Sequence, residues 1–254
     1  MTDYAIFPSL RDRVVLITGG ASGIGESLVE HFALQGAKVA FLDIDREAAA
    51  ELIGRLGEAP HRPVFREVDL RDIAALRETV EAIGRELGPI RVLINNAAND
   101  TRHKVEDVTV EYWDDRIAVN LRHQFFASQA VWPQMKAAGG GSIINMGSFT
   151  YLRGEGGFPG YSASKAGVHG LTRGLARDLG PDRIRVNTLM PGWVMTRRQL
   201  DLWVDEAGER EIAEKQCLKE KVQPGDIARM ALFLASDDSA ICSAQQFIVD
   251  GGWV

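Results

Sequence analysis

A glycine-rich segment between an apolar run and an amphipathic run constrains the fold of this chain more than any other feature. Thr18-Gly19-Gly20-Ala21-Ser22-Gly23-Ile24-Gly25 follows the apolar run Val14–Ile17, and Ile24, Leu28 and Phe32 then recur at helical spacing. Glycines at such a junction allow a tight turn and let a phosphate approach the helix N-terminus. The segment therefore predicts a dinucleotide-phosphate site, and a glycine-rich turn without a ligand is the alternative. The predicted contacts are Gly19, Ser22, Gly23, Ile24 and Gly25.

The alternation of apolar and amphipathic stretches continues along the chain. It predicts strands near residues 14–17, 39–42, 64–65, 92–94, 142–146, 184–189 and 246–249. It predicts helices over residues 24–32, from 46 onward, and over 73–83, 110–136, 161–179 and 225–234. Regular strand–helix alternation is typical of an α/β fold, here a doubly wound parallel sheet of the Rossmann type. No linker or repeat marks a boundary, so we expect residues 1–254 to form a single domain.

Composition excludes several classes of function. The formal net charge is −6 and no basic stripe occurs, so nucleic acid is not an expected partner. The two cysteines and five histidines show no metal-ligand spacing, so we expect no metal site. No apolar run is long enough to cross a membrane, and the first ten residues do not resemble a signal peptide. A cytoplasmic protein is the expectation.

Two acidic residues stand where a bound dinucleotide would need them. Asp43 ends the second expected strand, 18 residues after Gly25. A carboxylate there can accept hydrogen bonds from the adenosine ribose and would repel the extra phosphate of NADP, so the sequence predicts NAD. The alternatives are a surface aspartate or a cap of the next helix, a role for which Asp45 competes. Asp69, followed by Leu70, either contacts adenine or caps the helix after it.

The segment from about residue 193 to 221 interrupts the regular pattern. It is long and charged, and it follows the sixth expected strand at the carboxyl end of the sheet, where ligands bind in this class of fold. We expect a mobile substrate lid, with a solvated surface helix as the alternative.

A second group of residues suggests acid–base chemistry. Tyr161 and Lys165 stand four residues apart in an expected helix and so share one face. An ammonium group beside a phenol lowers the pKa of the tyrosine and makes it a usable base. Ser148 lies 13 residues before Tyr161, and Asn120 lies inside the long expected helix. An ordinary amphipathic pair and a water-satisfied asparagine are the alternatives.

These motifs, in this order, resemble the short-chain dehydrogenase/reductase family over essentially the whole chain. The resemblance rests on Thr18–Gly25, Asn95-Asn96-Ala97-Ala98, Asn120, Ser148, Tyr161-Ser162-Ala163-Ser164-Lys165 and Pro191-Gly192. It implies that Asn120, Ser148, Tyr161 and Lys165 are catalytic. It further implies that the cofactor is contacted by Asn96, Tyr161, Lys165, Pro191, Gly192, Val194 and Thr196. Ala98 departs from the glycine usual in the family, so the pocket there is expected to be slightly narrower.

A narrower resemblance is to the bacterial NAD-dependent aldose 1-dehydrogenases within that family. It rests on residues 5–10, 99–103, 107–109, 112–114 and 120–123. It implies oxidation of an aldopyranose such as D-xylose, D-galactose, L-arabinose or L-fucose at its anomeric carbon to the lactone. Tyr161 would remove the hydroxyl proton, Ser148 would orient the hydroxyl, and Asn120 would hold a proton-carrying water. The family resemblance also implies a homotetramer.

We expect the sugar to be held mainly by Asn99 and Asp100, which follow the fourth expected strand at its carboxyl end. The other expected substrate contacts are Ser148, Thr150, Tyr161 and Trp193. A simple turn is the alternative for Asn99 and Asp100, because their residue types favour turns. Two other functions stay open: a polyol or 3-oxoacyl reductase of the same family, and a non-catalytic dinucleotide-binding regulator.

Overall fold

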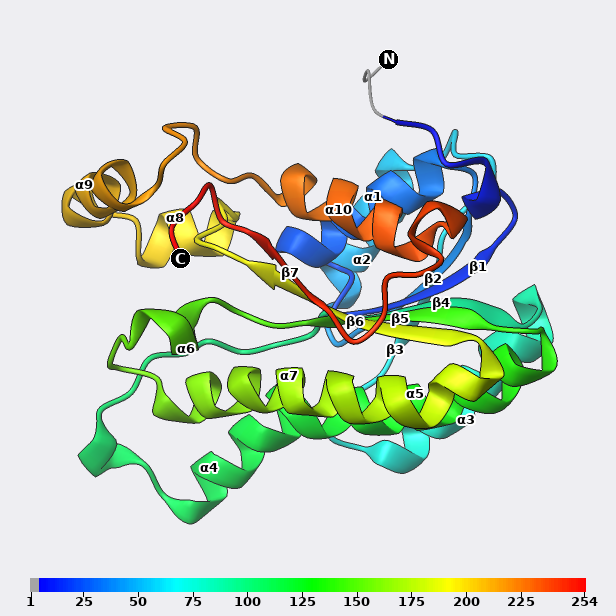
Figure 1. The fold of residues 1–254 in the computed structure, drawn as a ribbon, viewed down its shortest axis with the longest axis horizontal. Helices are drawn as coiled ribbons and strands as arrows, with labels where there is room; N and C mark the ends of the chain where they lie inside the picture. The colour runs from blue at the N-terminus through cyan, green and yellow to red at the C-terminus, as the bar shows by residue number, and fades with distance from the viewer. Residues whose placement is uncertain (1–4) are drawn as a thin grey trace.

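The centre of the molecule is one sheet of seven parallel strands in the order β3-β2-β1-β4-β5-β6-β7 (Figure 1). The computed structural model describes residues 5–254, so residues 1–4, the start of the expected domain, lie outside the described part. The doubly wound sheet predicted from the sequence is confirmed. The strands are β1 (Val14–Thr18), β2 (Lys38–Asp43), β3 (Val64–Glu67), β4 (Ile90–Asn95), β5 (Gly141–Met146), β6 (Ile184–Pro191) and β7 (Gln246–Val249).

Helices cover both faces of the sheet (Figure 1). One layer consists of α1 (Gly23–Leu34), α2 (Arg46–Arg55) and α10 (Pro224–Ala235). The other consists of α3 (Ile73–Leu87), α5 (His123–Ala137) and α7 (Pro159–Leu179). The remaining helices are α4 (Val110–Ile117), α6 (Thr150–Arg153), α8 (Arg197–Leu202) and α9 (Glu206–Lys215), with short turns η1 (Pro8–Leu10), η2 (Val105–Asp107), η3 (Ala118–Arg122), η4 (Gly180–Asp182) and η5 (Asp237–Ser239).

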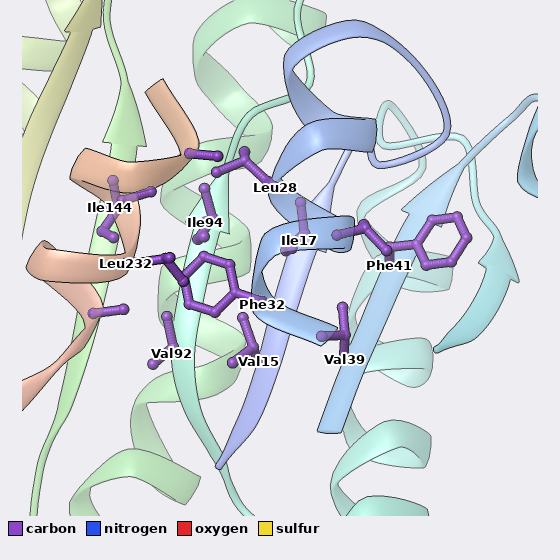
Figure 2. Packing of buried hydrophobic residues seen from close by; sticks show 14 of the residues in the cluster. Val15, Ile17, Leu28, Phe32, Val39, Phe41, Val92, Ile94, Ile144 and Leu232 are labelled. Atoms are coloured by element: carbon purple, nitrogen blue, oxygen red, sulfur yellow. The ribbon is translucent and has the colours of Figure 1, made fainter. Parts of the chain in front are cut away.

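The two layers divide the side chains of each strand between them. Val15 and Ile17 of β1 pack with Phe32 of α1 and Leu232 of α10, as Figure 2 shows. Leu16, between them in sequence, belongs to the cluster on the opposite face. Because successive side chains of a strand point to opposite faces, a sheet covered on both sides needs continuous apolar strands. For this reason the positions of the strands could be predicted from the sequence.

The long helix expected over residues 110–136 is present but not regular. It consists of α4, the π-helical turn η3 and α5 in direct succession. A π turn adds one residue to the helical ladder and is frequent at functional sites. Here it contains Asn120, whose side chain is fully buried.

The segment expected to form a lid contains two helices. Thr196 caps α8 by accepting a hydrogen bond from the Gln199 amide, and Asp205 caps α9 in the same way through the Gly208 amide. Ile212 of α9 is buried, so this segment is anchored to the body of the protein. The helices lie beside the C-terminus at one end of the sheet (Figure 1). Movement of this segment stays a prediction.

Candidate active site

The glycine-rich segment forms the turn between β1 and α1. Gly19 and Gly23 have φ angles of +66° and +58°, a left-handed conformation that favours glycine. A Cβ atom on Gly25 would lie 1.8 Å from the carbonyl oxygen of Gly19, so only glycine fits there. Ser22 is the N-cap residue of α1 and makes no side-chain cap, so an anion can take that place at the helix terminus. The turn thus fits a dinucleotide phosphate.

Asp43 faces this turn from the end of β2. Its Oδ2 accepts a hydrogen bond of 2.9 Å from the Ala21 amide, and its Oδ1 accepts one of 2.7 Å from the Ile44 amide. Asp45, not Asp43, caps α2, by accepting from the Ala48 amide. The capping alternative for Asp43 is therefore wrong, and its carboxylate lies beside the glycine turn.

Asp69 does not cap a helix either. Asp72 caps α3, while Asp69 forms an ion pair of 2.6 Å with Arg71, which holds the pKa of Asp69 below its ordinary value. The capping alternative for Asp69 is thus wrong, and its contact with adenine stays a prediction. Leu70 is half-buried against the core.

Asn96 ties the end of β4 to the glycine turn. Its Nδ2 donates hydrogen bonds to the carbonyl oxygens of Thr18, at 3.1 Å, and Gly19, at 2.8 Å. The Thr18 hydroxyl in turn accepts from the Asn96 amide at 3.0 Å. These bonds fix the crevice between β1 and β4, where the strand order reverses.

A pocket opens at the carboxyl ends of these strands. It gathers thirteen of the residues singled out in the sequence, namely Ile24, Asn96, Ala98, Asp100, Ser148, Thr150, Tyr161, Lys165, Pro191, Gly192, Trp193, Val194 and Thr196. It also includes six charged, amide or aromatic residues that the sequence analysis missed, namely Arg102, Phe149, Arg153, Glu155, Phe158 and Gln199. These come from loops and short helices, which leave no periodic signal. Asn99, Asn120, Asp43 and Asp69 are not among the lining residues.

The tyrosine and lysine lie on α7 as expected. Lys165 is almost fully buried, and its Nζ donates a hydrogen bond of 2.7 Å to the carbonyl oxygen of Met146. The same Nζ lies 5.6 Å from the centre of the Tyr161 ring. Ser148 is also buried, just after β5, and hydrogen-bonds with Tyr161. The structure thus brings Ser148, Tyr161 and Lys165 together.

The electrostatics of this group differ from the expectation. Burial raises the pKa of Tyr161, the negative charge of Asp100 raises it further, and only the hydrogen bond with Ser148 acts in the opposite direction. Burial also lowers the pKa of Lys165 to about 7, which Asp100 partly offsets. The pKa of Tyr161 is therefore not lowered by Lys165 as expected, because burial dominates among these protein groups.

The Asn120 side chain hydrogen-bonds the loop after β4 and does not line the pocket. Its Oδ1 accepts a hydrogen bond of 2.7 Å from the Asn99 amide, and its Nδ2 donates one of 3.1 Å to the Asn99 carbonyl. Its own carbonyl oxygen accepts from Nε2 of Gln124 at 3.1 Å. The π turn thus holds in place the loop that carries Asp100.

Asn99 and Asp100 have different environments. The Asn99 side chain accepts from the Thr101 amide at 2.9 Å, which closes a local turn. Asp100 lines the pocket, and its carboxylate accepts from Nε of Arg198 at 3.2 Å and from Nε2 of Gln199 at 2.6 Å. The turn alternative therefore describes Asn99, while Asp100 faces the site.

Trp193 is packed against the body of the protein. It is 9% exposed and clusters with Phe149, Met190 and Ile212. Its Nε1 donates a hydrogen bond of 3.1 Å to Oε1 of Gln199, the residue whose amide nitrogen bonds Asp100. A continuous chain of hydrogen bonds therefore links Trp193, Gln199 and Asp100 along one wall of the pocket.

Over residues 5–254, no group of three or more His, Cys, Asp or Glu side chains could hold a metal ion. No helix in the same range is long and apolar enough to span a membrane.

Comparisons with known proteins point in one direction. A family model described as enoyl-(acyl carrier protein) reductase matches residues 19–254. The Rhizobium meliloti protein named "Probable galactose dehydrogenase GalD" is 50% identical over 97% of this chain and 96% of its own length. The D-xylose 1-dehydrogenase of Caulobacter vibrioides is 48% identical over 98% of both chains. A blue fluorescent protein from a metagenomic library, solved in complex with NADPH, has a TM-score of 0.89 at 34% identity, covering 97% of this chain and 99% of its own.

Proposed function

The chain belongs to the short-chain dehydrogenase/reductase family, and on that premise we propose that it oxidises an aldopyranose at the anomeric carbon to the lactone. The observation that carries the proposal is that Asp100 and Tyr161 line one pocket at the carboxyl end of the sheet. The names of the relatives that are about half identical, a galactose and a D-xylose dehydrogenase, support a sugar substrate.

The protein groups divide the chemistry between them. Tyr161 removes the proton of the anomeric hydroxyl, and Ser148 hydrogen-bonds the same oxygen and orients it. Lys165, held by the Met146 carbonyl, places a cation beside the phenol while it remains protonated. Asn120 acts as a positioning residue through the Asn99 backbone. The protein mainly positions the reactants and controls one proton transfer.

The cofactor of this proposal is NAD. It would lie along the glycine turn, with its ribose at Asp43 and its adenine near Asp69 and Leu70. Its nicotinamide would lie near Tyr161, Lys165, Pro191, Gly192, Val194 and Thr196. When bound, it supplies the hydride acceptor. The carboxylate of Asp43 beside the turn favours NAD over NADP, because it would repel a ribose phosphate.

The sugar would be held by polar groups on one side and an aromatic wall on the other. Asp100 supplies acceptors for sugar hydroxyls, and the Thr150 hydroxyl is buried without a hydrogen-bond partner among the described residues. An unpaired buried hydroxyl in a pocket wall is a natural partner for a ligand hydroxyl. Trp193 contributes the aromatic wall.

In the cell we expect a cytoplasmic homotetramer.

A substrate panel tests the proposal. The purified protein is mixed with NAD and with aldoses, polyols or 3-hydroxyacyl thioesters, and NADH is followed by absorbance. We expect an aldose to give the highest kcat/KM and a lactone as product. A higher kcat/KM with a polyol or a thioester would show that the proposed substrate class is wrong. Absence of turnover with all three classes, despite dinucleotide binding, would favour a non-catalytic regulator.

A further inference from the structure

Four arginine side chains surround a cavity at the amino ends of the strands, and the function proposed above leaves this cavity unused. Its arginines are Arg13, Arg91, Arg183 and Arg185. Arg13 directly precedes β1, Arg91 lies at the start of β4, and Arg183 and Arg185 lie at the start of β6. Strand β5 lies between β4 and β6 in the sheet. The catalytic pocket lies at the carboxyl ends of the same parallel strands, so the two cavities lie at opposite ends of the sheet.

The four guanidinium groups are unequally satisfied. Arg13 forms an ion pair of 3.0 Å with Asp237, and Arg185 donates to the carbonyl oxygens of Leu234 and Ser236. In the part of the chain that the structure describes, the side chains of Arg91 and Arg183 make no hydrogen bond or ion pair, and Nε of Arg91 is buried. Among the described residues, the guanidinium N–H groups of Arg91 and Arg183 therefore have no protein acceptor and can donate to a ligand.

Positive charge is in excess there, because four arginines face one carboxylate. Asp237 is the one acidic residue among the described lining residues, although the whole protein carries a formal charge of −6. Burial and the neighbouring Arg13 both hold the pKa of Arg91 below its ordinary value, and the same two causes lower that of Arg185. Like charges brought together in this way favour the entry of an anion.

Two glycines allow close approach of the backbone segments that carry Arg91 and Arg183. Gly140 has φ of +131°, and a Cβ atom there would lie 2.5 Å from the carbonyl oxygen of Arg183. A Cβ atom on Gly141 would lie 2.9 Å from the carbonyl oxygen of Arg91. The glycines therefore let β5 begin tightly between the segments that carry these two side chains.

We propose that this cavity binds a phosphate group, with Arg91 and Arg183 as the principal contacts and Arg13 and Arg185 supplying further positive charge. Guanidinium groups match phosphate oxygens in pairs, and phosphate carries enough negative charge to balance several of them. The group is either inorganic phosphate or the phosphate of a small monoester. This site is separate from the glycine turn, which serves the dinucleotide.

Calorimetric titration tests the proposal. Sodium phosphate is added at constant ionic strength to protein saturated with NADH, so that the dinucleotide site is filled. We expect one phosphate site, and the double variant Arg91→Gln/Arg183→Asn should bind at least tenfold more weakly, about 1.4 kcal/mol. Asparagine is used at 183 because that residue has φ of +58°, which asparagine tolerates. Arg210→Gln, at an exposed arginine on α9, removes one positive charge far from the cavity and should leave the affinity within twofold.

The outcomes separate the sources of the phosphate. Methyl phosphate binding as tightly as inorganic phosphate assigns a monoester, and binding of inorganic phosphate alone assigns the free ion. The proposal is overturned if NADH abolishes phosphate binding, if neither compound binds, or if the double variant binds like the wild type. The single variants repeat the comparison if the double variant does not fold.

Discussion

The phenol of Tyr161 is surrounded by groups that favour its neutral form. Burial and the carboxylate of Asp100 both raise its pKa, and Lys165 has a pKa of only about 7, so the lysine loses charge as the solution becomes alkaline. A proton acceptor in such surroundings is strong once ionised but rarely ionised at neutral pH. This balance makes two measurements informative.

The first is Tyr161→Phe. Only the phenolic hydroxyl is lost, so we expect turnover to fall by roughly 10²–10⁴-fold or more, with NADH affinity close to normal. Tyr151→Phe is the matched control, because that hydroxyl bonds Gln246 and lies outside the pocket lining. Steady-state rates and fluorescence titration of NADH measure the two effects. A variant that keeps a tenth of the wild-type turnover would exclude Tyr161 as the base.

The second is the pH dependence of oxidation. A tyrosine pKa above its ordinary value of about 10 means that the phenolate fraction grows with pH throughout the neutral range. Log kcat/KM should therefore rise from pH 6 to pH 9, and the slope should change near pH 7, where Lys165 loses its proton. The titration belongs to the coupled pair. A flat profile, with chemistry rate-limiting, contradicts a tyrosine base.

Asp43 controls the choice of cofactor in our proposal. Asp43→Ala should weaken the binding of NAD and reduce discrimination against NADP. The substitution removes the acceptor for the ribose hydroxyls and also the charge that would repel the NADP phosphate. Asp45→Ala is the control: it removes a nearby carboxylate that caps α2, costs about 1 kcal/mol of stability, and should leave the cofactor ratio unchanged. The ratio of kcat/KM for NAD and NADP is measured for each. If that ratio is the same in Asp43→Ala and wild type, another group selects the cofactor.

The regular elements were predictable because each has a periodic apolar pattern. Strand β1 and helix α1 were expected within one or two residues of their observed bounds, because a sheet buried on both faces requires such runs. The π turn at Asn120 was not, and the bonds that the Asn120 side chain makes there reach the backbone of Asn99, 21 residues earlier. Such long-range contacts have no signature in local sequence.

The short helices around the pocket were also beyond sequence reasoning. Helices α6 and α8 have four and six residues, too few for a periodic signal. As a result Gln199 on α8 was not anticipated, although its amide lies between Trp193 and Asp100. Arg153 on α6 was missed for the same reason, and it pairs with Glu211 of α9 across the pocket rim.

Asp100 connects the loop after β4 to α8 and also lines the pocket where we propose that the sugar binds, and one comparison separates these roles. Asp100→Ala should lower kcat/KM for the aldose at least tenfold, about 1.4 kcal/mol, without changing NAD affinity. It should also shift the pH profile to lower pH, because the charge that raises the pKa of Tyr161 is lost. Arg198→Gln removes the bond between Arg198 and Asp100 but keeps the Asp100 carboxylate. Its kcat/KM for the aldose should stay within threefold of the wild-type value. Equal losses in both variants would mean that Asp100 only anchors α8.

The sheet places two chemically different hollows at its opposite ends. The carboxyl ends carry the catalytic pocket, and the amino ends carry the arginine cavity. The first follows from the order of the strands, which reverses between β1 and β4. The second depends on which residues begin the strands, so it varies independently of catalysis. A ligand at the amino end can therefore act on stability without contacting the reacting atoms.

Assembly of four subunits should depend on the outer face of α5. Phe125 and Trp132 lie seven residues apart, which is two helical turns, and are 38% and 37% exposed. Large apolar side chains on one exposed face mark an interaction surface. The aromatic residue near the C-terminus is occupied within the chain, since Trp253 packs on Phe149 and Trp193.

We therefore expect light scattering after gel filtration to give a four-subunit mass for the wild type and a smaller species for Phe125→Glu. A glutamate at that position would bury an unpaired charge between subunits, which costs several kcal/mol and disfavours association. Leu34→Glu, at an exposed leucine on α1, is the matched control and should keep the wild-type mass. Far-UV circular dichroism of each variant confirms that the subunit is folded. A four-subunit mass for Phe125→Glu would exclude this face from the assembly, and a single-subunit mass for the wild type would exclude the tetramer itself.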